Sequence, residues 1–142
     1  MSRRLVLLCG AALLVLATGC NTRTPLRWEI PAGYVGWTVV QYESATCAAF
    51  PLDSGYKVIR LNERGVACTS EKLEAGEAFD RYLYVENTGH TSEIDQGTLV
   101  WAGVYFSHTK REFHFIGSEA DYHASPDNSQ TVDQRCSADP NC

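Results

Sequence analysis

The sequence lacks the residue groupings on which most catalytic centres depend. Its 142 residues contain no Cys-x-x-Cys, no Gly-x-Ser-x-Gly and no glycine-rich phosphate loop. No carboxylates form an acid–base pair, and no histidines stand at metal-ligand intervals. The sequence therefore predicts no catalytic residue, no metal site and no cofactor.

Positive charge and methionine are also scarce. The chain has 12 basic and 17 acidic residues, and loss of a leader containing Arg3 and Arg4 would leave ten basic residues and a net charge of −7. This charge disfavours nucleic acid as a partner and adhesion to anionic lipid. One methionine beside 11% aromatic residues favours a β protein over a helical bundle.

The N-terminus has the pattern of an export signal. Arg3 and Arg4 precede the apolar run 5–16, which is too short to span a bilayer. The following Ala-Thr-Gly-Cys20 resembles a bacterial lipobox, in which the leader (here residues 1–19) is removed and the cysteine thiol carries a diacylglycerol. The resemblance implies that acylated Cys20 holds the protein in membrane lipid, and two or three acyl chains would make that attachment effectively permanent. Secretion without a lipid is the alternative.

Residues 20–27 are predicted to form a lipidated tether. The seven residues after Cys20 reach at most about 24 Å when extended, so a partner must lie close to the membrane. Asn21 stands where an aspartate would resemble an inner-membrane retention signal. We therefore expect a location in the cell envelope, on the periplasmic side of the outer membrane in a bacterium that has two membranes.

Residues 28–124 have the pattern of a β domain. The stretch 30–42 starts with a Pro-Ala-Gly turn and then alternates with period two, with apolar residues on both faces, which predicts a strand in the middle of a sheet. The run 98–106 is apolar on both faces and predicts a second central strand. Together the segments predict an all-β fold, a small β-sandwich or barrel-like domain of about six to seven strands. The other expected strands are 28–30, 55–61, 66–70, 79–85 and 112–116.

Residues 125–142 contain almost no apolar side chains. Such a segment buries too little surface to become ordered by itself. We expect a flexible C-terminal tail unless a disulfide cross-links it.

Four cysteines remain once Cys9 leaves with the leader and Cys20 is acylated. An even number in an exported protein predicts disulfides, and four cysteines allow three connectivities. We favour the pairs Cys47–Cys68 and Cys136–Cys142. The first pair closes a loop of about 20 residues, which stabilises by roughly 3 kcal/mol in the chain-entropy model. A thiol nucleophile at Cys68, or zinc held by His108, His114 or His123, would be a functional alternative that no spacing supports.

Aromatic side chains are the remaining candidates for binding. Tyr34 and Trp37 could belong to a platform on which sugars stack, although core packing is the commoner role of such residues. His114 alternates with Phe113 and Phe115, so it is predicted to face solvent opposite a core pair.

A series of residues along the β domain resembles an uncharacterised domain family of bacterial lipoproteins and exported proteins. Its most specific part is Ile-Pro-x-Gly-Tyr-x-Gly-Trp at residues 30–37, and the resemblance covers about residues 28–117. It implies export and a β fold, and it brings no activity with it. The tail with Cys136 and Cys142 lies outside the resemblance.

Two functions follow from these patterns. The first is a non-catalytic binding or structural module of the envelope, which would contact a protein or glycan through the loops 31–34, 47–54 and 87–96. The second is an envelope hydrolase or thiol-redox protein with a nonstandard site near Cys68, Thr69 and Ser70. A free thiol at Cys68 would favour the second function over the first.

Overall fold

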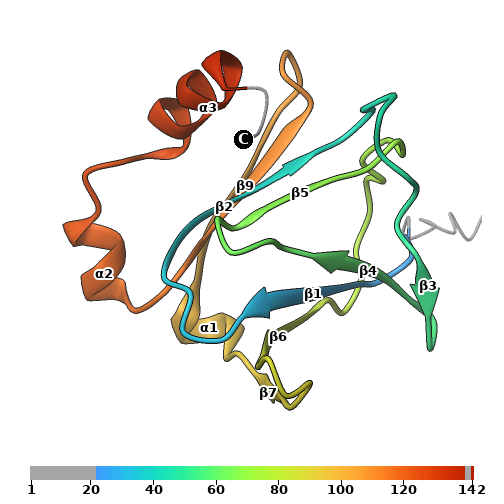
Figure 1. Cartoon of the computed structure of the whole chain (residues 1–142), viewed down its shortest axis with the longest axis horizontal. Helices are drawn as coiled ribbons and strands as arrows, with labels where there is room; N and C mark the ends of the chain where they lie inside the picture. The colour runs from blue at the N-terminus through green and yellow to red at the C-terminus, as the bar shows by residue number, and fades with distance from the viewer. Residues whose placement is uncertain (1–21, 140–141) are drawn as a thin grey trace, which may run out of the picture.

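The computed structural model describes residues 22–139 and 142 and has the all-β, sandwich-like fold predicted from the sequence (Figure 1). The leader 1–19, Cys20 and Asn21 lie outside the described residues. A five-stranded sheet has the order β3-β4-β1-β6-β7, and a four-stranded sheet has the order β5-β2-β9-β8. The strands are β1 Leu26–Pro31, β2 Gly36–Gln41, β3 Leu52–Asp53, β4 Tyr56–Arg60, β5 Val66–Cys68, β6 Arg81–Val85, β7 Thr91–Glu93, β8 Val100–Phe106 and β9 Arg111–Ile116. The helices are α1 Gln96–Leu99, α2 Glu119–Ala124 and α3 Ser129–Ala138.

Strand β1 is the centre of the five-stranded sheet, where the sequence predicted only a short opening strand. It runs parallel to both β4 and β6, with Trp28 opposite Ile59 on one side and Tyr82 on the other. Trp28 and Ile30 are fully buried in the core between the sheets, whereas Arg27 and Glu29 pair on the outer face. Since parallel strands start at the same edge, β1, β4 and β6 begin at one edge of the sheet and end at the opposite edge.

Strand β2 lies between β5 and β9, as its two-sided apolar pattern predicted. Val40 belongs to the core between the sheets, while Trp37 and Val39 belong to a second cluster on the outer face. That outer cluster also contains Phe113 of β9 and Val132 of α3. Both faces of the four-stranded sheet are therefore covered, one by the other sheet and one by the C-terminal segment.

The run 98–106 is not a second central strand. Residues Gln96–Leu99 form the short helix α1, and β8 is the edge strand of its sheet, next to β9. The ladder shifts register between Trp101 and Val104, and Ala102 adopts a left-handed φ of 49°. This β-bulge exposes Ala102 and Gly103, so apolar composition alone did not indicate the place of the strand in the sheet.

The C-terminal segment is not the unpacked tail expected from its composition. Residues Ser129–Ala138 form α3, which starts with a capping box between Asn128 and Thr131. Val132 and Cys136, one helical turn apart, are buried against the outer face of the four-stranded sheet. Figure 1 shows α3 over that sheet, and two apolar side chains are enough because the sheet supplies the rest of the cluster.

The start of the chain is also more ordered than the expected tether 20–27. Thr22 forms a β-bridge with Glu77, and the Arg23 guanidinium pairs with Asp80 at 2.5 Å. Strand β1 begins at Leu26, whose N–H donates to the same Asp80 carboxylate at 2.8 Å. From Thr22 onward the segment is part of the domain.

Candidate functional site

A polar cleft lies at the carboxyl ends of the parallel strands β1, β4 and β6. It has a volume of about 560 Å³. The three strands deliver their following loops to one edge, so residues distant in sequence meet there. Glu29, Ile30, Pro31, Ala32, Arg60, Leu61, Glu63, Val85, Glu86, Asn87 and Thr88 line the cleft.

An ion-pair network borders this cleft through Glu29 and Arg60. The Glu29 carboxylate accepts from Arg27 at 3.0 Å and from Arg60 at 2.6 Å. Arg27 also donates to Asp53, and this hydrogen bond is the main cause of a lowered pKa of the Asp53 carboxyl. The exposed rim carries Glu63, Glu86 and the polar side chains of Asn87 and Thr88, so the cleft is suited to hydrogen-bonding or basic groups of a ligand.

The structure brings together part of the loop edge predicted from the sequence. Residues 31–32 and 87–88 line the same cleft. The loop 47–54 instead borders a separate cavity of about 330 Å³ beside Cys68, and Arg60 lies between the two cavities. Sequence reasoning missed Glu29 and Arg60, because only the parallel pairing of β1 with β4 places them at the cleft.

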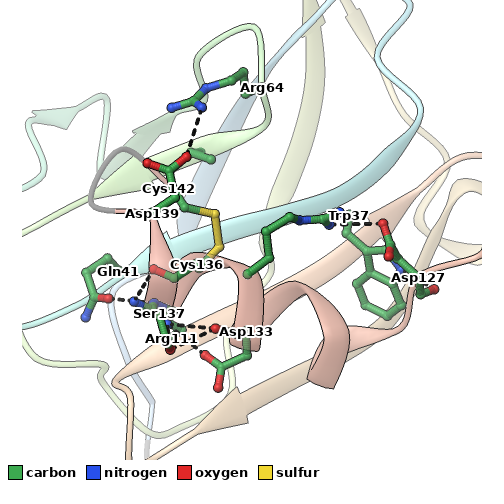
Figure 2. The surroundings of a disulfide bond; sticks show 12 residues. Trp37, Gln41, Arg64, Arg111, Asp127, Asp133, Cys136, Ser137, Asp139 and Cys142 are labelled. Atoms are coloured by element: carbon green, nitrogen blue, oxygen red, sulfur yellow. Dashed lines mark hydrogen bonds and ion pairs between the residues drawn. A yellow bond between two sulfur atoms is a disulfide. The ribbon is translucent and has the colours of Figure 1, made fainter.

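Tyr34 and Trp37 lie together beside a third cavity, of about 310 Å³, between β2, β5 and the α3 segment. The Tyr34 hydroxyl donates to the carbonyl of Trp37 at 2.6 Å. The Trp37 indole N–H donates to the carbonyl of Asp127 at 3.0 Å (Figure 2). The Trp37 ring contacts Phe115 and Tyr122. These polar atoms already have backbone partners, so the geometry gives both residues a packing role, and their use in binding sugar stays a prediction.

The two disulfides have the pairing predicted from the sequence. Cys47 bonds to Cys68, with Cα atoms 5.9 Å apart, and ties the loop after β2 to the end of β5. Cys136 bonds to Cys142, with Cα atoms 4.7 Å apart, at the end of α3 (Figure 2). In this state Cys68 has no thiol, and its neighbour Thr69 is fully buried. This geometry gives no support to a thiol site at Cys68.

The prediction that His114 faces solvent is wrong. Its side chain is 12% exposed and points between the sheets, because Phe113 and Phe115 occupy the outer face under the C-terminal segment. The imidazole packs edge-on against Trp28, with 4.7 Å between ring centroids, and its Nε2 lies 3.1 Å from Glu112.

Glu112 joins this interior histidine to a buried tyrosine. The Tyr42 hydroxyl donates to Glu112 at 2.6 Å. Burial works to raise the pKa of the Glu112 carboxyl, but its hydrogen bonds with His114 and Tyr42 and the nearby charges outweigh that effect, so the pKa is lowered. Burial raises the pKa of Tyr42. The cluster is an enclosed polar network rather than an open acid–base site.

The three histidines considered for zinc do not converge. His108 lies 3.5 Å from Asp133, His114 contacts Glu112, and His123 lies 3.7 Å from Glu119 within α2. Over residues 22–139 and 142, no group of three or more His, Cys, Asp or Glu side chains could hold a metal ion.

The fold and its cleft define the class of this protein as a small disulfide-linked β-sandwich domain. The chain belongs to a family of unknown function, DUF6843, whose model matches residues 23–139. The match extends past residue 117, so α3 and Cys136, which the resemblance left outside, lie within the family region.

One solved structure shares this fold. It is the crystal structure of a "Putative Lipoprotein from Bacillus anthracis", with a TM-score of 0.62 and 17% sequence identity, covering 81% of this chain and 91% of that chain. No curated protein matches the sequence. In the part of the chain that the structure describes, no helix is both long and apolar enough to cross a membrane.

Proposed function

We propose that this protein is a bacterial lipoprotein that is anchored through acylated Cys20 and binds a component of the cell envelope without catalysing a reaction. The lipobox-like Ala-Thr-Gly-Cys20 supports the anchor, as does the fold shared with the "Putative Lipoprotein". The cleft at the carboxyl ends of β1, β4 and β6 is the proposed binding site.

The position of the cleft relative to the start of the chain is the observation that carries this proposal. Strand β1 begins at Leu26, six residues after Cys20, and ends at Pro31 on the cleft. Its six residues span roughly 20 Å. An anchor at Cys20 therefore leaves the cleft on the side of the domain away from the lipid, where an envelope partner can reach it. Asn21 favours the outer membrane in a bacterium with two membranes.

The side chains that line the cleft limit the chemical classes of partner that it can bind. Glu63 and Glu86 give its rim a negative charge, and Asn87 and Thr88 add hydrogen-bonding groups. These groups suit a glycan or a polar, basic segment of an envelope protein, and they oppose a nucleic acid. The thiol-redox alternative is not favoured, because Cys68 is in a disulfide.

The binding proposal can be tested in living cells with a photo-reactive amino acid. Thr88 on the rim of the cleft is the test position, and Glu119, exposed on α2, is the matched control. We expect one defined adduct from position 88 that is lost when Glu63 and Glu86 are both changed to lysine. Equal labelling from positions 88 and 119, or an adduct that survives the lysine changes, would remove the cleft as the binding site.

A further inference from the structure

The side of the five-stranded sheet at which β1, β4 and β6 begin lies opposite the cleft and carries exposed apolar side chains. This side, here called the amino edge, is formed by the starts of β1, β4 and β6 and by the segment 76–79. Phe79 is 93% exposed, which is rare for a side chain of this size. A hollow of about 730 Å³ adjoins it and is lined in part by Pro25, Tyr56 and Ala78.

A second exposed apolar side chain lies close by. Leu52 is 69% exposed on β3, whose tight turn into β4 lies at the amino edge. In the described part of the chain the other large exposed hydrophobic is Val35, 55% exposed, which follows the carboxyl end of β1. Two of these three side chains thus lie toward the edge where the chain enters the domain.

The entry of the chain fixes how far this edge can be from Cys20. Thr22 bridges to Glu77, and the backbone N–H of Arg23 donates to the Glu77 carbonyl at 3.3 Å. Only Asn21 separates Thr22 from Cys20, so the two Cα atoms are at most about 7 Å apart. The segment that carries Phe79 is the same one that holds Thr22.

We infer that Phe79 and the hollow beside it form a membrane-contact surface, which inserts into the interfacial region of the bilayer that carries the anchor. The inference rests on the proposed acylation of Cys20. The hollow is more apolar than polar, although Thr22, Arg23 and Glu77 also line it. A phenylalanine and a tyrosine beside such a mixed hollow match the headgroup boundary, where aromatic side chains are favoured. The contact is apolar rather than electrostatic, because Arg23 is paired with Asp80 and Lys57 with Glu71 and Glu74.

The surface sets the orientation of the whole domain. With Phe79 in the interface, β1 runs away from the membrane and the polar cleft faces the envelope space. A lipid anchor alone would fix the distance of the domain from the bilayer without fixing its orientation.

The test measures the depth of two exposed positions in the acylated, full mature protein. Phe79→Trp and Val35→Trp are each reconstituted into phosphatidylcholine vesicles whose acyl chains carry bromine, which quenches tryptophan fluorescence on contact. The parent protein supplies the background from its own tryptophans. We expect quenching of Phe79→Trp at least threefold above that background, and Val35→Trp at the background level.

The outcomes separate this inference from the proposed anchor. Each sample is also floated with its vesicles on a density gradient, and the mass of its N-terminal peptide is measured. Flotation without extra quenching of Phe79→Trp, or equal quenching at positions 79 and 35, overturns the membrane-contact surface and leaves the anchor intact. Failure to float, with an unmodified Cys20, overturns the anchor and the inference that rests on it.

Discussion

At the scale of single residues, the interior of this domain is not purely apolar. Glu112, His114 and Tyr42 are joined by hydrogen bonds of 2.6 and 3.1 Å between the two sheets. The Tyr42 hydroxyl, both Glu112 oxygens and His114 Nε2 each have a hydrogen-bond partner, which offsets the cost of keeping such groups in a core. The histidine ring also fills space against Trp28, so this cluster serves packing as well as polarity.

The lowered pKa of Glu112 predicts a specific dependence of stability on pH. Below its ordinary value of 4.5 the unfolded chain takes up a proton at this carboxyl before the folded chain does. Stability from this group is therefore complete above about pH 4.5 and is lost as the pH falls through the lowered folded pKa. The free energy of unfolding, measured by urea titration between pH 6 and 3, should fall less steeply with decreasing pH for Glu112→Gln than for the parent protein.

The control for that prediction is a carboxylate at the surface. Glu93 has a pKa lowered by its hydrogen bond from Arg81, but both side chains are largely exposed. About 0.5 M salt should remove the effect of Glu93→Gln on the pH dependence of stability and leave the effect of Glu112→Gln unchanged. If the free energy of unfolding fell equally with decreasing pH for Glu112→Gln and the parent protein, the interior role of this carboxylate would be contradicted.

Trp37 offers a second prediction at the residue scale. Its ring contacts Phe115 and Tyr122, and its N–H holds the carbonyl of Asp127. Trp37→Ala should lower the free energy of unfolding by about 3 kcal/mol, near the low end for large aromatic deletions because the residue is half-buried. Trp37→Phe, which keeps most ring contacts, should cost about 1 kcal/mol. Urea titration measures both losses. A loss below about 1 kcal/mol for Trp37→Ala would indicate an exposed side chain that contributes little to packing, and it would favour a sugar-binding platform.

At the scale of elements, α3 is held by one arginine as well as by its own apolar face. Arg111 of β9 donates to the Asp133 carboxylate at 3.0 Å, to the Ser137 hydroxyl at 2.9 Å and to the carbonyl of Cys136 at 3.1 Å (Figure 2). Its Nε donates to Gln41 at 2.9 Å, which fixes the guanidinium on the sheet. This fork geometry needs arginine, since lysine cannot donate in so many directions at once.

Replacing that arginine tests how α3 is attached. Arg111→Lys should cost about 2 kcal/mol, because the buried Asp133 carboxylate loses its hydrogen bond from the guanidinium, and it should speed proteolysis within 129–138. The matched control is Arg81→Lys, whose pair with Glu93 is exposed and should contribute less than about 0.5 kcal/mol. Equal effects of the two changes on urea unfolding would mean that α3 does not depend on this network.

The elements also show what could be predicted from the sequence and what could not. The alternation in 35–42 predicted both faces of β2 correctly, because period-two burial is a local property. The edge position of β8 and the packing of α3 depend on contacts with distant strands, so composition misplaced both. The cleft depends on the parallel order of β4, β1 and β6, and no local pattern around Glu29 or Arg60 records that order.

At the scale of the whole molecule, the two ends of the parallel strands of one sheet differ in chemistry. The chain enters at the edge that carries Phe79, and the polar cleft lies at the other edge. One disulfide ties the loop after β2 to the end of β5, and the other closes a small ring between α3 and Cys142. The arrangement fits a domain held close to a membrane, with its binding surface turned away from the lipid.

The anchor at Cys20 is the claim on which this orientation depends, and mass spectrometry of the mature N-terminal peptide tests it most directly. We predict a peptide that begins at Cys20 and carries a diacylglycerol on the thiol. We also predict that Cys20→Ala releases the protein from membranes washed with carbonate. An unmodified N-terminal peptide, or a Cys20→Ala protein that stays in the washed membranes, would contradict this anchor.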